Sequence, residues 1–531
     1  MASSTRAGTG PLLRLALRRD RWLLPAWSLG FAAMAGFSAT ATVDLYPNEA
    51  GRVVAANVVN ATPALVALYG RIYDPTSLGA LSLFKMTAFG AAMVGALMVV
   101  VTVRHTRAEE ESNRLELLGA GIVGRDAPLT AGLAVAFGGS LLIGLLTALA
   151  LAAGGLPVAG SFAFGAGWAA AGMAFSAVAA LMAQVTTSTR TATGLGITAI
   201  AVAYALRAIG DMTQGAPSIV SWLSPIGWTQ QLRAFAGNRW WVVLLTLALC
   251  AVLVAAAFAL RSRRDLGGGL VSDRPGPSEG ALTGVWDLAL RLQRGVLLAW
   301  GLAFLGFGLV LGSVSSSISG MLSSEAMRRF IVALGGEQGL INAFLATELG
   351  IFGTIVAAYG IVAVSHLRSE ETAGHTEMVL ATAATRSRWA TSHLAVAVGG
   401  VAVLLLACGV GIATGYALDI GGLGHTWTIL VAALARVPAA WVMVGVALAV
   451  FGWAPRLTGT VWGLFVAFVA IGEFGPLWHA PQWLMDLSPF VHSPELPVTS
   501  GGVGPLLALT AVAAALTVLG YVGWRRRDLS P

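Results

Sequence analysis

The residues best suited to chemistry lie in one charged segment that occurs twice in the chain. Residues 107–125 read RAEEESNRLELLGAGIVGR, and residues 368–386 read RSEETAGHTEMVLATAATR. Six of the nineteen aligned positions are identical and five of those six are charged, although only 11% of all residues carry a charge. Shared composition does not explain this agreement. The two segments supply the following candidate residues: Arg107, Glu109, Glu110, Arg114, Glu116, Arg125, Arg368, Glu370, Glu371, His375, Glu377 and Arg386.

The spacing of these charges indicates a helical surface that docks another protein. Glu109 and Glu116 are seven residues apart and would share one face of a helix, as would Glu370 and Glu377. A single charged run of this kind is usually a solvated link between two helices. Because the run is repeated with its charges in register, we favour a pair of equivalent docking surfaces for a two-fold symmetric partner.

No other group of residues has the spacing of a catalytic or metal site. The seven histidines are scattered, and Cys250 and Cys408 each lie inside an apolar stretch, so neither a zinc site nor a disulfide framework is expected. A phosphate-binding loop needs the pattern G-x4-G-K-[ST], but the only lysine, Lys85, follows a phenylalanine. We therefore expect no catalytic residue, no metal and no cofactor bound by this chain, which would not be an enzyme by itself.

The composition places the chain in a lipid bilayer. Its 531 residues are 56% hydrophobic and their mean hydropathy is +0.78, which leaves no room for a sizeable soluble domain. A helix needs about 20 apolar residues to cross a hydrocarbon core of about 30 Å. The sequence predicts an all-α polytopic membrane protein with twelve transmembrane helices, at residues 22–44, 82–103, 128–152, 161–183, 193–210, 240–260, 295–317, 342–365, 391–416, 427–451, 457–474 and 503–523.

The distribution of basic residues gives the orientation. With the N-terminus in the cytoplasm, 23 of the 32 Lys and Arg residues fall in cytoplasmic segments, as the positive-inside rule requires. The C-terminus is then cytoplasmic too, and both charged segments lie on that side of a plasma (inner) membrane. This topology also explains the pI near 10 without a nucleic-acid partner.

Further repeats divide the chain into two similar halves. Glycine, proline and charge make residues 265–282 resemble a linker, between a first unit at 1–264 and a second at 283–531. The sequence RRDL follows the sixth and twelfth predicted spans, starting at Arg263 and Arg526. Because each unit has an even number of spans, we expect two parallel six-helix repeats related by a pseudo-two-fold axis along the membrane normal.

Charges inside the spans are rare, so each one is a candidate for function. Arg436 lies in the middle of the tenth predicted span, with Glu348 and Glu473 as candidate partners. We favour a buried ion pair that fixes helix packing over a role in substrate passage or gating. Arg207 and Asp211 have the i, i+4 spacing of a helical ion pair at the outer end of the fifth span.

Three features flank or fill the spans. Amphipathic stretches at 12–21 and 285–294 are either interfacial elbow helices or ordinary basic flanks. Segments 212–239 and 476–500 are rich in Trp and Pro and predict short outer helices or an interfacial aromatic belt. Small residues of the fourth span are expected at helix contacts: Gly165, Gly167 and Gly172.

The repeated R-x-E-E-x5-E block, an L-S-P segment in each half and the fused twelve-span layout resemble a group of actinobacterial permeases. These are the polyketide or tetronasin antibiotic exporters, which are ABC exporters with type-2 membrane domains. In that superfamily the loop between the second and third helices is a coupling helix that sits in a groove of the ATPase. The resemblance places coupling helices near 108–120 and 369–381. It implies two copies of a separate ABC ATPase that bind ATP and Mg, and export of hydrophobic or amphipathic compounds by multidrug efflux.

Two other functions stay open from the sequence. The same machinery could export a lipid or cell-envelope precursor. A proton-coupled secondary transporter of the major-facilitator kind also has twelve spans in two parallel halves. Such transporters normally rely on carboxylates within the membrane, and here only Glu348 lies well inside a span.

Overall fold

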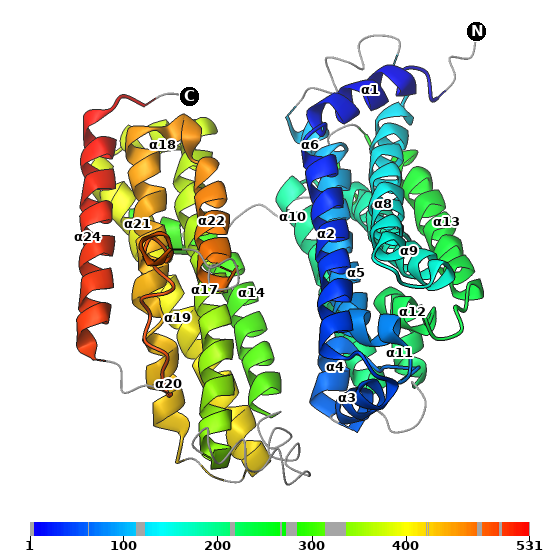
Figure 1. Cartoon of the computed structure of the whole chain (residues 1–531). Helices are drawn as coiled ribbons and strands as arrows, with labels where there is room; N and C mark the ends of the chain where they lie inside the picture. Colours follow the sequence, from blue (N-terminus) through cyan, green and yellow to red (C-terminus); the bar gives the residue numbers. More distant parts are fainter. Residues whose placement is uncertain are drawn as a thin grey trace. The chain divides into compact units, whose positions relative to one another are not determined.

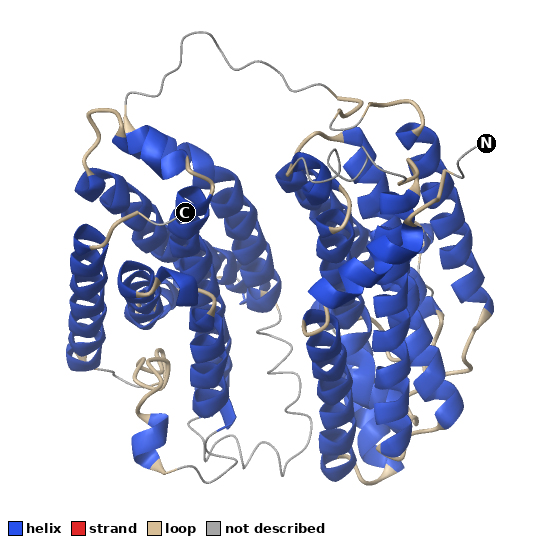
Figure 2. Cartoon of the chain, turned by 90° about the horizontal axis from the view of Figure 1, so that it is seen from above, coloured by secondary structure: helices blue, strands red, loops and turns tan. Residues whose placement is uncertain are grey.

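A computed structural model describes residues 5–61, 63–112, 123–212, 218–265, 268–271, 284–313, 336–420, 422, 424–474, 481–498 and 502–529. The chain forms two compact units, Met1–Pro275 and Gly276–Pro531, and the division between them falls inside the predicted linker. The regular secondary structure of the described residues is helical throughout (Figure 2).

Six long apolar helices form the body of the first unit (Figure 1). They are α2 (Leu23–Leu45), α5 (Leu78–Arg104), α8 (Ala127–Ala153), α9 (Val158–Val185), α10 (Thr189–Asp211) and α13 (Trp241–Arg261). Helix α9 is the most buried of them and contacts α5, α8, α10 and α13. Its sequence is rich in Ala and Gly, and such small side chains allow neighbouring helix backbones to approach closely.

Shorter helices cover the two ends of the first unit. Helix α1 (Thr9–Arg19) lies at one end with the short α6 (Arg107–Glu111) (Figure 1). The opposite end carries α3 (Glu49–Ala61), α4 (Pro63–Tyr69), α11 (Ile219–Trp222) and α12 (Pro225–Gln231). The sequence predicted short helices for the last two, but α3 and α4 were not expected because they are too short and mixed in polarity to resemble spans.

The described residues of the second unit form five helical stretches that are long and apolar enough to span a membrane. They are α14 (Val285–Gly312), α17 (Gly336–Thr372), α19 (Arg386–Ile420), the consecutive pair α20 (Thr426–Leu434) and α21 (Val437–Trp453), and α24 (Val503–Arg526). Helix α14 packs along α19, and α21 packs along α24 and α17. The shorter elements are α18 (His375–Leu380), the 3-10 turn η2 (Pro455–Leu457), α22 (Thr460–Phe474) and α23 (Gln482–Met485).

The described part of the chain therefore holds eleven candidate spans instead of the twelve predicted. The predicted span at 457–474 corresponds to α22, whose 15 residues extend about 22 Å at 1.5 Å per residue. That length is less than the hydrocarbon thickness of about 30 Å. The preceding helix α21 ends at Trp453, the turn η2 follows at Pro455–Leu457, and α22 begins only at Thr460.

Among the described residues, a separate short helix precedes the first span in the first unit only. There α1 ends at Arg19 and the chain turns at Asp20, a buried residue, before α2 begins at Leu23. In the second unit α14 continues without interruption from Val285 into its span. Of the two alternatives for 285–294, the structure does not show a separate helix, because no residue there interrupts the helical hydrogen bonds.

Glycines set the closest helix contacts of the first unit. Gly165 of α9 faces Gly144 of α8, and a Cβ added to either would lie 2.2 or 2.4 Å from the other's carbonyl oxygen. A Cβ on Gly172 would lie 2.5 Å from Ser140 Oγ, whereas Gly167 has more space, with Leu232 at 3.3 Å. Gly165 and Gly172 therefore occupy the tight packing positions that the sequence predicted.

We expect Gly144→Val to destabilise the first unit, because its side chain would force α8 away from α9. Overpacking of this kind costs about 1–3 kcal/mol. The matched control is Gly138→Val on the same helix, where an added Cβ meets nothing within 4 Å. Thermal unfolding of the purified full chain in detergent measures both. Equal melting temperatures for the two variants would contradict this assignment of the contact.

Candidate functional site

Glu110 lies at the centre of a buried group of arginines in the first unit. Its side chain is only 2% exposed, and its two oxygens lie within 3.0 Å of Arg107, Arg261 and Arg264. Arg264 binds in a bidentate manner, with both distances 2.8 Å. Such fork-shaped pairing is the strong form of a carboxylate–guanidinium contact. We call these four residues the first-unit cluster.

Backbone carbonyl groups help to accommodate the excess positive charge of the first-unit cluster. Arg107 donates to the carbonyl of Ala183, near the C-terminal end of α9, at 2.9 Å, and to that of Gly268 at 3.1 Å. Arg264 also donates to Oε1 of Gln184 at 2.9 Å. The C-terminal end of a helix carries partial negative charge, so the end of α9 partly neutralises the arginines. The cluster thereby joins α6, α9 and α13.

Arg125 fastens the start of α8 to the same place. Its Nη2 donates to the carbonyls of Arg261 at 2.7 Å and Arg264 at 2.6 Å. In return, Nε of Arg261 donates to the carbonyl of Arg125 at 2.7 Å. Both ends of the segment between α5 and α8 are therefore tied to the residues at the end of α13.

The second unit contains corresponding contacts at the aligned positions. Glu371, also 2% exposed, pairs with Arg527 at 2.5 and 2.7 Å and with Arg368 at 3.4 Å. Arg386 donates to the carbonyl of Arg527 at 2.9 Å, as Arg125 does to Arg264. Trp524 donates to the carbonyl of Arg386 at 3.2 Å, where the first unit uses Arg261. We call Arg368, Glu371 and Arg527 the second-unit cluster.

The sequence analysis singled out the glutamates but missed their partners. Arg264 and Arg527 are each the second arginine of an RRDL sequence, 154 and 156 residues beyond the glutamate that they bind. The repetition of RRDL after the last helix of each half was the available signal. In the sequence this repeat indicates only a duplication, because the positive-inside rule already explains a basic residue after a span.

Glu109, a predicted residue, and its neighbour Glu111, which was not predicted, contact helices beside the first-unit cluster. Glu109, 16% exposed, pairs with Arg19 of α1, and Glu111 accepts a hydrogen bond from the Thr189 amide at the start of α10. Arg114 and Glu116 lie outside the described residues. Of the predicted helix at 108–120, the structure therefore describes only the first residues, which belong to α6 (Arg107–Glu111).

Asp20 fixes helix α1 to the same end of the first unit. Its carboxylate lies 2.5 Å from Nε2 of His105 and 3.0 Å from Arg104. Burial raises the pKa of Asp20, but the hydrogen bond and charge of His105 and the charge of Arg104 outweigh it and hold the pKa below its usual value. The contact therefore stabilises the fold at neutral pH and is lost only as the pH falls through that lowered pKa.

In the second unit the charged segment forms two helices instead of the single helix predicted at 369–381. Helix α17 continues to Thr372, and Gly374, with φ of 75°, turns the chain into α18. That left-handed conformation suits glycine because it has no Cβ. Glu370 lies 3.5 Å from His366 and 3.2 Å from His375. On α18, Glu377 is exposed and Met378 is 64% exposed.

The predicted pair of Arg207 and Asp211 is present, with 3.8 Å between Nη1 and Oδ2. Arg207 is completely buried, donates to the carbonyls of Val66 at 3.3 Å and Leu68 at 3.0 Å, and lies 4.4 Å from the Tyr204 ring. It therefore holds α4 against α10, which is a structural role.

Arg436 lies at the break between α20 and α21. Its Nη2 donates to the carbonyl of Ala346 on α17 at 3.1 Å, and its side chain packs against Gly353. The predicted pairing with Glu348, which lies on the same helix as Ala346, stays a prediction. The Glu473 side chain lies outside the described residues.

We expect Glu110→Gln and Glu371→Gln to destabilise the protein strongly, because each leaves buried guanidinium groups without their counter-ion. Loss of one partner of a buried ion pair typically costs about 3–5 kcal/mol. The matched controls are Glu109→Gln and Glu370→Gln, neighbouring and more exposed carboxylates whose pairs contribute about 0–1 kcal/mol. Thermal unfolding of the full chain compares them. A similar loss of stability in the controls would show that the buried ion pairs contribute no more to stability than the more exposed ones.

Comparison with known proteins assigns the chain to a family. A family model described as "Multidrug efflux system permease Rv1217c, C-terminal domain" matches residues 10–261 and 282–525. The multidrug efflux system permease protein Rv1217c of Mycobacterium tuberculosis is 41% identical over 527 residues, which cover 98% of this chain and 95% of that protein. With eleven candidate spans in the part of the chain that the structure describes, this multi-pass membrane protein belongs to the family of multidrug efflux system permeases.

Proposed function

We propose that this permease is the membrane subunit of an ATP-driven ABC exporter whose ATPase is supplied by two copies of a separate chain. The observation that carries the proposal is that both charged segments are anchored in the same way. Each buried glutamate binds an arginine beyond the last helix of its own unit. A segment that receives force from a partner must be fixed to the helices that move, and these ion pairs provide that attachment.

The docking contact itself would be made by the exposed tip of each segment. In the second unit the tip is α18, where Met378 and Glu377 are exposed while Thr376 is buried. A protruding apolar side chain beside a charge is typical of the anchor residues of protein interfaces. The buried members of the two clusters would position the tip and would not touch the ATPase.

The arrangement in the membrane follows from the same proposal. With both segments in the cytoplasm, the N- and C-termini are cytoplasmic and the two units are parallel six-helix repeats, with α22 as the short fifth span of the second. The family match to two stretches of similar length and the equivalent contacts of Arg125 and Arg386 support a duplication. ATP and Mg would be bound by the ATPase alone.

The cargo would be hydrophobic or amphipathic, and antibiotics and other drugs are the first candidates. The relative from Mycobacterium tuberculosis is named as a multidrug efflux permease. The spans of this chain carry few charges, so a strongly charged solute would find few counter-ions along the way.

Transport by inside-out membrane vesicles tests the function. We expect accumulation of a fluorescent hydrophobic cation such as ethidium that requires this chain, its co-expressed ATPase and ATP. An ATPase variant whose phosphate-loop lysine is replaced should abolish accumulation, whereas a proton ionophore should leave it unchanged. Accumulation that needs a proton gradient and not ATP would contradict the proposal.

Met378→Asp should weaken copurification of the ATPase by about tenfold or more, because it places a charge in the apolar centre of the contact. The chain itself should remain folded, since Met378 is 64% exposed. Leu457→Asp is the matched control, because Leu457 is a similarly exposed residue of η2 in the same unit, at 55%. ATPase bound per chain is measured after affinity purification. Unchanged binding by Met378→Asp, or equal loss in the control, would exclude α18 as the docking helix.

A further inference from the structure

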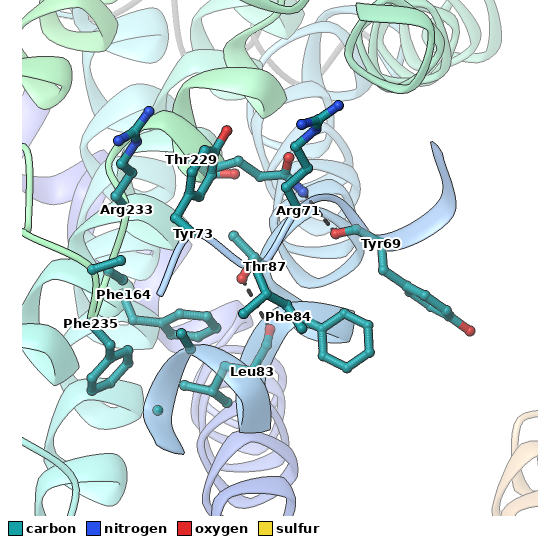
Figure 3. Close-up of a pocket in the computed structure, with 16 residues that line it drawn as sticks. Tyr69, Arg71, Tyr73, Leu83, Phe84, Thr87, Phe164, Thr229, Arg233 and Phe235 are labelled. Atoms are coloured by element: carbon teal, nitrogen blue, oxygen red, sulfur yellow. Dashed lines mark hydrogen bonds between the residues drawn. The ribbon is translucent and has the colours of Figure 1, made fainter. Parts of the chain in front are cut away.

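The arginines at the two ends of the first unit differ in their contacts. At the end opposite α1, the Arg233 guanidinium carbon lies 4.2 Å from the centre of the Tyr73 ring (Figure 3). At the α1 end, Arg14, Arg18 and Arg21 are exposed, and their side chains make no ion pair or hydrogen bond with another described residue. Within the described part of the chain, their charge is therefore not neutralised.

The side of α1 that faces away from the protein carries two arginines between two leucines. At about 3.6 residues per turn, this side presents Leu17, Arg14, Arg18 and Leu15 in that order around the helix. Leu15 and Leu17 are 49% and 48% exposed, whereas Ala16 on the opposite side is buried. Residues four apart are neighbours on a helix surface. Arg14 and Arg18 thus form one basic strip with apolar side chains along both edges.

The basic strip of α1 lies next to the first span. Only residues 20–22 separate α1 from α2, and the candidate span begins at Leu23. Trp22 in this turn is 76% exposed, and the Arg21 guanidinium carbon lies 5.9 Å from its ring centre. Tryptophans at the ends of spans gather at the headgroup level of a bilayer. The strip is therefore close to the phosphate groups of the membrane surface.

Two acids lie against α1 and the turn that follows it, and both are paired. Asp20 is 1% exposed and contacts Arg104 and His105. Glu109 pairs with Arg19, on the side of α1 that faces the protein. These pairings leave the outer face of α1 positively charged.

Helix α1 is also fastened to both ends of the charged segment 107–125. At its C-terminal end, Arg19 forms the pair with Glu109. Just before its N-terminal end, the carbonyl of Ala7 accepts a hydrogen bond from the Gly124 amide at 2.8 Å. Figure 1 shows α1 beside α6 at this end of the unit. Whatever holds α1 in place therefore also restrains the charged segment.

We propose that the outer face of α1 binds the anionic headgroups of membrane phospholipids and thereby holds the first charged segment in place. Phosphate oxygens complement the basic strip, while the leucines beside it and Trp22 enter the apolar layer below the headgroups. Basic residues beside a span are attracted to anionic lipids, whereas phosphatidylcholine has no net charge. The order of the charged segment thus depends on the charge of the surrounding lipid.

Hydrogen exchange by the purified full chain in nanodiscs tests this surface without the ATPase or transport. The nanodiscs contain phosphatidylcholine alone or phosphatidylcholine mixed with anionic phosphatidylglycerol. We expect phosphatidylglycerol to slow amide exchange in α1 and α6 about threefold or more, because a bound ligand opposes local opening of the helices that it holds. The double variant Arg14→Gln, Arg18→Gln should exchange equally in the two lipids. Both side chains are exposed, so this variant should keep the melting temperature of the wild-type chain.

Two control variants isolate the charge of α1. The double variant Arg291→Gln, Arg294→Gln removes two exposed arginines from the start of α14, and it should keep the lipid effect within about twofold. The double variant Arg14→Lys, Arg18→Lys should also keep the effect, because lysine retains the positive charge without the planar guanidinium group.

Several results would contradict the proposal. Equal exchange of the wild-type chain in the two lipids, or loss of the effect in the lysine variant, would overturn the binding of anionic headgroups. An effect that persists in the glutamine variant would do the same, and failure of the ATPase to copurify with that variant would then assign the outer face of α1 to a protein partner. Slower exchange confined to α1 would overturn the link to the charged segment.

Discussion

A buried carboxylate that binds an arginine beyond the last helix of its unit connects most of the elements described above. A charge in a dry environment is costly unless it is paired and hydrogen-bonded, so Glu110 and Glu371 require their partners at fixed positions. Through those partners the charged segment contacts α9 and α13 in the first unit, and α24 in the second. The position of the segment is therefore determined by helices far from it in sequence.

The two units satisfy this constraint by different means. The first-unit cluster uses three arginines and the carbonyl groups at a helix end. In the second unit one position is taken by Trp524, and Arg527 lies 4.8 Å from the Trp524 ring and 4.9 Å from that of Phe451. A cation can be stabilised by carboxylates, carbonyl dipoles or aromatic faces. The hydrogen bond to the backbone carbonyl at the start of the following helix is also kept, although its donor is Arg261 in the first unit and Trp524 in the second. The continuous α14 and the turn at Asp20 show further divergence between the units.

Most of the fold could be predicted from the sequence, because long apolar stretches have few alternatives to a helix in a bilayer. Eleven predicted spans coincide with long helices, although α14 starts 10 residues before its predicted span and α17 ends 7 residues after its own. The differences have local causes, such as Pro455 before α22 and the absence of a break within α14. The site was predictable only in part. The repeated charges identified Glu110 and Glu371, but no local pattern distinguishes a buried glutamate from an exposed one such as Glu109. The roles of Arg264 and Arg527 depend on contacts across more than 150 residues.

The sequence distance within each ion pair also has a consequence for biosynthesis. Arg264 and Arg527 follow every long helix of their own unit, so the ribosome completes them last. Until each arginine emerges, its glutamate has no bidentate partner, and the charged segment lacks that part of its attachment. Completion of a unit thus adds the last ion pair that holds the segment. A chain interrupted just before that arginine would contain all the membrane helices of the unit, but its buried glutamate would lack the bidentate partner, which quality-control proteins could detect as an unpaired charge.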